Sequence, residues 1–435
     1  MKVIVLGAGV IGTSTAWYLQ QAGHDVTVLE RNAGAARETS FGNGGQISVS
    51  HAEPWANPSA PLKLLKWLGR EDAPLLFRLR ADPAQWRWGL KFLMECPAKR
   101  STRNMVQLLN LGTYSRDSLQ ALRRDTGIAY DHLEKGILHY YTSQQEFDLS
   151  LEPARVMREL GCERQVIGAD EVVRIEPAMA HIRPRLAGAT YTSADESGDV
   201  HKFTTGLAAR AAERGVGFRY GVRVQALRAE GGRMTGVEIA NEEGMYETLR
   251  ADAYVLAAGS FSPLLAKGVG VSLDVYPAKG YSATLPVLDA AAAPQVSLTD
   301  DEYKLVFSRF GDRLRIAGTA ELNGYGLELN PVRCAALVKR TLEVFPGVSR
   351  PELATFWAGL RPATPGNVPY IGRSKVEGLY LNTGHGTLGW THGCGSGRAL
   401  AELMSGRRPE VDFAFCGMPA GPVAMPRMQK LPQSY

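Results

Sequence analysis

Three glycines and one acid near the start of the chain have the spacing of a dinucleotide-binding turn. Gly7, Gly9 and Gly12 stand in the order Gly-x-Gly-x-x-Gly, and Glu30 ends the next apolar run. Gly7 permits a tight turn, Gly9 lets the backbone approach a pyrophosphate, and Gly12 allows a helix to pack closely on a strand. A carboxylate at Glu30 suits a ribose hydroxyl and would repel a 2′-phosphate, which argues against NADP.

The elements around these residues are those that such a turn requires. Residues 2–6, KVIVL, form a continuous apolar run that is typical of a buried parallel strand. A helix is predicted from about Val10 to Gln21, with the amides of Val10 and Ile11 directed at phosphate, and Gly23 ends it. Residues 25–30 predict a second strand. Because all parts are in register, a glycine-rich turn without a ligand is disfavoured.

Two later segments favour FAD over NAD, and a third, residues 39–48, leaves the choice open. Residues 39–48 are small or amide-bearing, which fits either a surface loop or backbone wrapped around a second part of a cofactor. Residues 250–262 predict a strand that ends in Ala-Ala-Gly at Gly259, where backbone can pass close to a bulky group. Residues 379–406 predict a strand, a glycine-rich loop and a helix. That helix start suits the anionic N1/O2 edge of a reduced flavin, for which a nicotinamide enzyme has no counterpart.

Composition excludes several other classes of protein. The net charge of +5 is too small to indicate nucleic-acid binding, and 435 residues predict more than one compact unit. The five cysteines form no C-x-x-C pair, which predicts a reducing compartment without disulfides or a metal site; His392 and Cys394 are interpreted as packing residues. The chain begins directly with a strand and has no apolar stretch of about 20 residues, so we expect a cytoplasmic protein without a signal peptide.

The cofactor domain is predicted to be discontinuous. We assign 1–55, 195–267 and 361–412 to FAD binding, 56–194 and 268–360 to a substrate domain, and 413–435 to a tail. The tail is rich in Pro and Gly from residue 417 onward and is expected to be loosely ordered. A helical pattern at 102–125 fits either domain.

A basic, tryptophan-containing segment allows two interpretations. Residues 61–100 hold nine basic and four acidic residues together with Trp67, Trp86 and Trp88. Basic residues interleaved with Trp and Leu suit a helix lying on an anionic membrane surface. Alternatively, the tryptophans belong to the core beneath a solvated basic face, which the residues alone slightly favour.

Five stretches resemble the FAD-dependent D-amino acid dehydrogenases, a branch of the glycine oxidase and D-amino acid oxidase group. They are the first 31 residues, "ETSFGNGGQIS", "YPAKGYS", "FWAGLRPATPGNVPYIGR" and "LNTGHGTLGWTHGCGSG". The resemblance covers essentially the whole chain and implies an α/β and α+β fold, in which a Rossmann-like FAD domain is interleaved with a substrate domain on a mixed or antiparallel sheet. It also implies oxidation of D-amino acids to 2-oxo acids and ammonia, with electrons passed to a membrane quinone or another acceptor.

The resemblance also implies roles for individual residues. Arg361 of "GLRP" would bind the substrate carboxylate, Tyr303 would lie over the flavin, and His51 stands near the place of a family tyrosine. His51 could take the ammonium proton or be a residue of the pocket wall. The implied cofactor contacts are those of Gly7, Gly9, Val10, Ile11, Gly12, Glu30, Arg31, Ser40, Asn43, Gln46, Val224, Gly259, Gly386, Thr387, Leu388, Gly389 and Thr391.

Two departures and three alternatives stay open. No cysteine follows "GLRP" where sarcosine oxidases attach flavin, so FAD is expected to be non-covalent, and His51 leaves the preferred side chain in doubt. The nearest alternative is a flavin enzyme for glycine, sarcosine or a cyclic imino acid such as a D-proline derivative. A colourless NAD-linked dehydrogenase and a flavin-holding subunit without activity are the alternatives from other classes.

Overall fold

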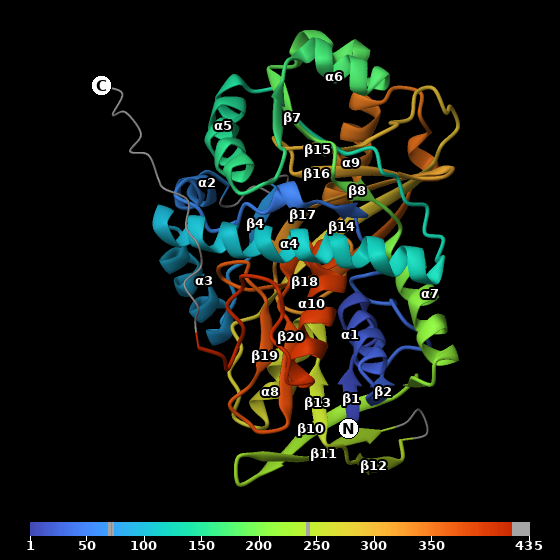
Figure 1. Ribbon diagram of the computed structural model, residues 1–435. Coiled ribbons are helices and arrows are strands. Elements are labelled where there is room, and N and C mark those ends of the chain that lie inside the picture. The colour runs from blue at the N-terminus through green and yellow to red at the C-terminus, as the bar shows by residue number, and fades with distance from the viewer. Residues whose placement is uncertain (68–70, 72–73, 241–243, 420–435) are drawn as a thin grey trace.

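A computed structural model describes residues 1–67, 71, 74–240 and 244–419 (Figure 1). Its first sheet has six strands, all parallel except the edge strand β19. In spatial order they are β19 (Tyr370–Arg373), β20 (Leu379–Thr383), β13 (Ala253–Leu256), β1 (Lys2–Leu6), β2 (Asp25–Leu29) and β9 (Gly217–Arg219).

Both faces of this sheet are buried, which explains why its strands are continuous apolar runs. Val3 and Val5 of β1 pack beneath helices, whereas Ile4 and Leu6 face the opposite layer. The helices on the first face are α1 (Val10–Gln21), α7 (Val200–Glu213) and α10 (Gly389–Met404). The opposite layer is made of β10 (Arg223–Glu230), β11 (Arg233–Ala240), β12 (Tyr246–Leu249) and α8 (Ser262–Lys267).

The second sheet has nine strands and is mixed. Most neighbours are antiparallel, but β5 runs parallel to β15 and β4 runs parallel to β17. The order is β18 (Thr355–Ala363), β14 (Tyr276–Pro286), β17 (Arg313–Leu322), β16 (Leu305–Phe310), β15 (Ser297–Asp300), β5 (Ile137–Tyr141), β7 (Gly188–Thr192) and β6 (Gln165–Ile167), with β4 (Leu75–Phe77) beside β17. The helices α6 (Ala169–Ile175) and α9 (Pro331–Val344) pack in one hydrophobic core with this sheet.

Helix α4 (Ala98–Thr126) joins the two halves and crosses the middle of the molecule (Figure 1). Its residues 105–109 pack against α5 (Gln144–Glu159), and its residues 111–122 pack in the core beneath the first sheet. It ends at Gly127, whose φ of +62° is the left-handed conformation that favours glycine. The predicted helix at 102–125 therefore contacts both halves.

The remaining short elements connect the sheets. They are the two-stranded pair β3 (Gln46–Ile47) and β8 (Glu196–Ser197), the helices α2 (Ala60–Trp67) and α3 (Pro83–Glu95), and the 3-10 turns η1 (Val49–His51), η2 (Pro177–Arg185), η3 (Gly259–Phe261), η4 (Pro351–Leu353) and η5 (Gly386–Leu388).

The predicted fold class is confirmed, because a parallel nucleotide-binding sheet drawn from distant segments is interleaved with a mixed sheet. The first residues of the predicted tail, 413–416, contact the first half of the molecule. Phe413 and Phe415 are buried against the first sheet, and the Cys416 amide donates to the Ile371 carbonyl at 2.8 Å. Residues 420–435 lie outside the described part of the chain, and the domain boundaries stay predictions.

Candidate active site

Of the three glycines in the turn between β1 and α1, only Gly9 has free space beside its Cα, and this is the position where a pyrophosphate would approach. A Cβ on Gly12 would lie 1.9 Å from the Gly7 carbonyl oxygen, and one on Gly7, whose φ is +108°, would lie 2.7 Å from the Ala257 carbonyl oxygen. A Cβ on Gly9 would meet only the Ser40 hydroxyl, at 3.7 Å. Gly7 and Gly12 are therefore required by the fold, whereas Gly9 is not.

The N-terminus of α1 is available to an anion. Gly9 is its N-cap and supplies no side chain, and the Val10 amide donates to the Ser40 hydroxyl at 3.2 Å. The next amides, beginning with that of Ile11, carry the positive end of the helix dipole. Ser40 thus connects the segment 39–48 to the predicted phosphate site.

Glu30 is buried and organises the loop after β2. Its Oε2 accepts from the Ala8 amide at 2.9 Å, and its Oε1 accepts from the Asn32 amide at 2.9 Å. The Val222 amide donates to the Glu30 carbonyl at 2.9 Å, which brings the start of β10, and with it Val224, to the same edge. Arg31 pairs with Glu38 and lies over the Phe261 ring at 3.9 Å. Contacts of these residues with adenosine remain predictions.

The second glycine-rich segment meets the segment 39–51 across the chain. Gly386 begins η5 with a φ of +54°, and Gly389 begins α10. The Thr391 hydroxyl accepts from the Ser48 amide at 3.0 Å, and the Gly259 carbonyl accepts from the Thr383 hydroxyl at 3.2 Å. All three predicted cofactor segments therefore converge at one place.

A cavity of about 770 Å³ opens at this junction, within the range of natural ligand sites. Its lining includes Asn43 and Gln46 from one segment and Thr387 and Leu388 from the other. Both ring nitrogens of the buried His385, next to η5, have no hydrogen-bond partner among the described residues. A bare helix N-terminus, an open glycine and unpartnered polar atoms fit a large, partly anionic cofactor such as FAD. None of the cavity-lining residues is a cysteine.

Arg361 lies in the cavity wall that the second sheet provides. Its Nη1 donates to the Thr319 carbonyl at 2.7 Å, and a Cβ on the adjacent Gly280 would lie 2.2 Å from that nitrogen. Burial, and then the nearby charge of Arg333, lower the pKa of Arg361 to about 10. The guanidinium therefore remains charged at neutral pH.

Arg361 differs from the other Lys and Arg residues that line the cavity. Each of those has a carboxylate partner, whereas no ion pair joins Arg361 to an acid within the described ranges. The partnered set is Lys63 with Glu146 at 3.0 Å, Arg155 with Glu152 at 2.6 Å, Arg164 with Glu53 at 2.7 Å, and Lys304 with Asp301 at 3.0 Å. A cation in a cavity wall without an acid partner can bind an anion that enters the cavity.

Two residues in the cavity wall, Thr319 and Lys304, have a left-handed backbone conformation. Thr319, whose carbonyl accepts from Arg361, has a φ of +51°, and Lys304 has a φ of +55°. A β-branched residue in this region costs about 1–3 kcal/mol and is found mainly at functional sites. At Thr319 the left-handed backbone places the carbonyl where it accepts from Arg361. At Lys304 the backbone is also left-handed, and the side-chain ammonium of this lysine donates to Asp301.

The structure does not bring Tyr303 to the cavity. Its side chain is 44% exposed, and its ring lies under the Arg340 guanidinium at 4.0 Å. Residues 301–304 form a turn in which Lys304 takes a left-handed conformation, and Lys304 rather than Tyr303 faces the cavity. The prediction that Tyr303 assists Arg361 is therefore not retained.

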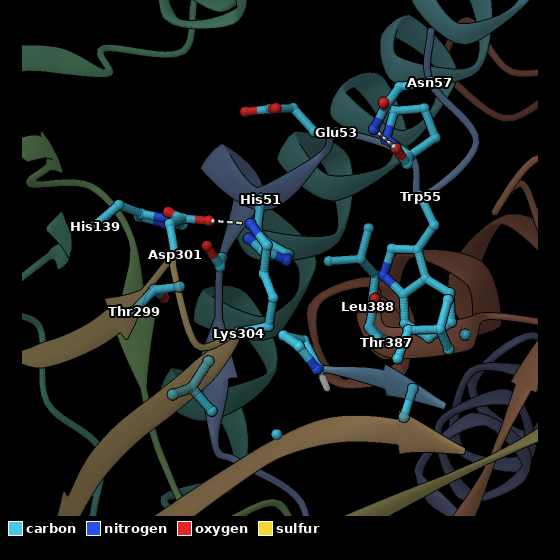
Figure 2. Close-up of a pocket in the computed structure, with 18 of the residues that line it drawn as sticks. His51, Glu53, Trp55, Asn57, His139, Thr299, Asp301, Lys304, Thr387 and Leu388 are labelled. Atoms are coloured by element: carbon cyan, nitrogen blue, oxygen red, sulfur yellow. Dashed lines mark hydrogen bonds and ion pairs between the residues drawn. The ribbon is translucent and has the colours of Figure 1, made fainter. Parts of the chain in front are cut away.

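His51 lines the cavity, as the sequence predicted, and has neighbours that the sequence did not reveal. His139, Asp301 and Lys304 lie beside it on one side, opposite Thr387 and Leu388 (Figure 2). His139 comes from the middle of β5 and the other two from the turn between β15 and β16. For His139 the sequence signal was a polar residue within an otherwise apolar strand, whereas Asp301 and Lys304 lie in a turn, where polar residues are ordinary.

The full chain has close relatives among known proteins. The family model described as FAD dependent oxidoreductase matches residues 2–403. A D-amino acid dehydrogenase of Dechloromonas aromatica is 59% identical over 95% of this chain and 99% of its own, and one of Paramagnetospirillum magneticum is 54% identical over 96% and 98%.

Solved structures share the fold at low identity. A glycine oxidase from Geobacillus kaustophilus superposes with a TM-score of 0.73 at 22% identity, covering 98% of each chain. An L-proline dehydrogenase from P. horikoshii superposes with a TM-score of 0.74 at 16% identity, covering 94% of each chain. At these identities the likeness concerns the fold alone.

Proposed function

The chain belongs to the FAD-dependent oxidoreductase family, and on this premise we propose that it is a D-amino acid dehydrogenase producing 2-oxo acids and ammonia. FAD is its cofactor. The relatives of 44–59% identity that share nearly its whole length carry that name, which supports this activity over one on glycine, sarcosine or a cyclic imino acid.

One observation carries the proposal for this chain. Arg361 is half-buried in the cavity wall without a carboxylate partner among the described residues, whereas the other cavity cations are paired. A planar guanidinium holds a carboxylate through two parallel hydrogen bonds, which fixes both its position and its orientation. A ligand with a single free carboxylate is therefore the charge that completes the site.

The chain's residues then position an amino acid for oxidation. Arg361 would hold the carboxylate, and the His51 ring faces the cavity. Burial, and then the neighbouring His139, lower the pKa of His51 to about 4, so its ring is neutral at physiological pH and too weak a base to take the ammonium proton, which favours a role in the pocket wall. When bound, FAD supplies the acceptor for the hydride that leaves Cα. Water hydrolyses the resulting imino acid.

Product analysis tests this proposal. The purified holoenzyme, supplied with an artificial electron acceptor, should form equal amounts of 2-oxo acid and ammonia from D-alanine or another D-amino acid and neither product from the L-enantiomer. Turnover confined to glycine, sarcosine or cyclic imino acids would assign the site to the alternative, and a flavin that no substrate reduces would indicate a non-catalytic subunit.

We further propose that electrons leave to a membrane quinone, with the protein bound peripherally. Among the described residues no helix is long and apolar enough to cross a bilayer. On α3, Trp86, Leu90 and Leu93 are 49–63% exposed on one face, and on α2, Leu62 and Leu65 are more than 70% exposed. Lys66 on α2 and Lys99 and Arg103 on α4 are exposed as well. An apolar face bordered by basic residues is what an anionic lipid surface binds.

The tryptophans divide between the two interpretations of this segment. Trp88 is buried in the core, its indole nitrogen donating to the Ala363 carbonyl at 2.8 Å, whereas Trp86 is 56% exposed. Trp67 is half-buried and lines the cavity, together with Lys63 of the same helix. Helix α2 therefore contributes both to the cavity wall and to the exposed apolar face, which supports an acceptor arriving from the membrane.

Replacing Leu62, Leu65 and Leu90 with serine is expected to weaken binding to anionic vesicles by on the order of tenfold or more, because it removes apolar surface that lipid would bury. Co-sedimentation with vesicles rich in anionic lipid measures this. Leu264→Ser is the matched control, because Leu264 is 56% exposed on α8. If the wild-type protein fails to bind such vesicles at low salt, the membrane proposal is wrong.

A further inference from the structure

The second sheet has a β-bulge next to Arg361. The register between β14 and β17 shifts there, so that two residues of β17, Thr319 and Ala320, face a single residue of β14, Gly280. A bulge bends its strand and changes the direction of the groups that the strand carries. Here the Thr319 carbonyl accepts from Nη1 of Arg361 at 2.7 Å. The bulge is therefore the part of the cavity wall that holds the arginine.

The backbone conformation of Thr319 is unfavourable for a β-branched residue. Its φ of +51° lies in the left-handed region, and its buried hydroxyl has no hydrogen-bond partner among the described residues. A residue in such a conformation persists only where its surroundings hold it. The contacts that hold the bulge therefore also keep the Thr319 carbonyl in the position that Arg361 uses.

Hydrogen bonds from three different elements hold the bulge. The Thr319 amide donates to the Lys304 carbonyl at 3.4 Å, and the Ala320 amide donates to the Pro74 carbonyl at 2.7 Å. The Ala320 carbonyl accepts from Nη2 of Arg333, on α9, at 3.0 Å. Of these three hydrogen bonds, the last alone involves a side chain, so a substitution can remove it without changing the backbone.

Arg333 lies outside the lining of the cavity and is 1% exposed. Its Nη1 donates to the Glu71 carbonyl at 2.8 Å, and no acid of the described ranges forms an ion pair with it. Burial of a guanidinium without an acid partner is costly, because its lost hydration is only partly replaced. Both hydrogen bonds of this arginine go to backbone carbonyls, and one of these carbonyls belongs to the bulge.

We infer that Arg333 is a positioning residue for the substrate carboxylate. By holding the Ala320 carbonyl, it keeps Thr319 left-handed, and the Thr319 carbonyl then fixes the guanidinium of Arg361. The inference rests on the proposed function in that Arg361 binds a carboxylate. A two-pronged contact depends on the angle of the guanidinium plane, so loss of this support weakens carboxylate binding although no group that touches the ligand is removed.

Two other roles of Arg333 predict different results. A purely structural arginine would affect stability and leave carboxylate affinity unchanged. An arginine that acts through its charge would attract the carboxylate whatever the conformation of Thr319. Glycine at position 319 distinguishes these roles, because glycine adopts a φ of +51° without strain and does not need the support of Arg333.

Binding of propionate to the substrate-free holoenzyme, measured by titration calorimetry, tests the inference, because propionate has a carboxylate and no amine. Arg333→Met is expected to raise the Kd for propionate by on the order of tenfold. The same change made in a Thr319→Gly background should have little effect, so the two substitutions are strongly non-additive. Val338→Ala, in the same core on α9, is the matched control for lost packing and should leave the Kd unchanged.

Arg333→Gln provides a second variant if Arg333→Met loses its flavin. Its amide keeps a polar group in the buried site but is too short to replace both hydrogen bonds, so it should show the same loss and the same dependence on residue 319. An unchanged Kd, or an equal rise in Kd with threonine and with glycine at 319, would overturn the inference. A wild-type protein that binds no propionate, or an Arg361→Lys protein that binds it normally, would overturn the carboxylate role of Arg361 itself and the inference with it.

Discussion

Replacing Arg361 with lysine is expected to lower kcat/KM for D-amino acids by about 30- to 1000-fold while the protein stays folded and yellow. A charged, two-pronged contact of this kind contributes about 2–4 kcal/mol, and an ammonium cannot reproduce its geometry. The loss should appear mainly in KM if the contact is equally strong in the ground state, and also in kcat if it aligns Cα with the flavin.

The effect on stability separates this role from a structural one. Arg361 has no carboxylate partner among the described residues, so Arg361→Met removes a half-buried charge without an acid partner and should leave the melting temperature unchanged or higher. Arg123→Lys is the matched control, because Arg123 is mostly buried and pairs with Glu196 at 2.6 Å outside the cavity. That variant should lose stability and keep its KM. An Arg361→Lys enzyme with wild-type kcat/KM would refute the assignment.

Adding a single methyl group at the first turn is expected to reduce FAD binding at two glycines but to reduce stability at only one of them. Gly12→Ala would place Cβ 1.9 Å from the Gly7 carbonyl oxygen, so the turn must open and FAD and stability should both be lost. Gly9→Ala has room for its Cβ, and the Gly9 φ of −71° suits alanine. The deflavinated Gly9→Ala protein should therefore melt like the wild type but bind FAD on the order of tenfold more weakly.

Flavin fluorescence titration and thermal melts of the deflavinated proteins measure both effects. Gly34→Ala serves as a control, because a Cβ there would meet only the Arg37 side chain, at 3.7 Å. Normal FAD affinity in Gly9→Ala would mean that this glycine does not face the pyrophosphate.

The nucleotide-binding half was predictable because its signals are local. The strand, turn, helix and acid from Lys2 to Glu30 follow one another within one βαβ unit, and backbone geometry alone requires Gly7 and Gly12. Burial on both faces of the sheet gives uninterrupted apolar strands, which are easily read. Arg361 was found through its motif, but its lack of an acid partner is visible only in three dimensions.

The rest of the site depends on contacts between distant segments. His51 and His139 are far apart in the chain, and nothing local indicates that their rings stack. The exchange of Tyr303 for Lys304 at the cavity follows from a left-handed residue in a tight turn, which a strand-alternation rule cannot anticipate. Trp88 and Trp86 differ in burial because they face opposite sides of α3, although both stand among basic residues.

Anaerobic reduction of the bound flavin tests the central claim most directly. The holoenzyme is mixed without oxygen or acceptor with a D-amino acid, its L-enantiomer, and the D-amino amide that lacks the carboxylate. Bleaching of the yellow colour by the D-amino acid alone is the predicted result, because only that compound offers Arg361 a carboxylate with the correct face toward the flavin. Equal bleaching by the D-amino amide, or none by any D-amino acid, would contradict it.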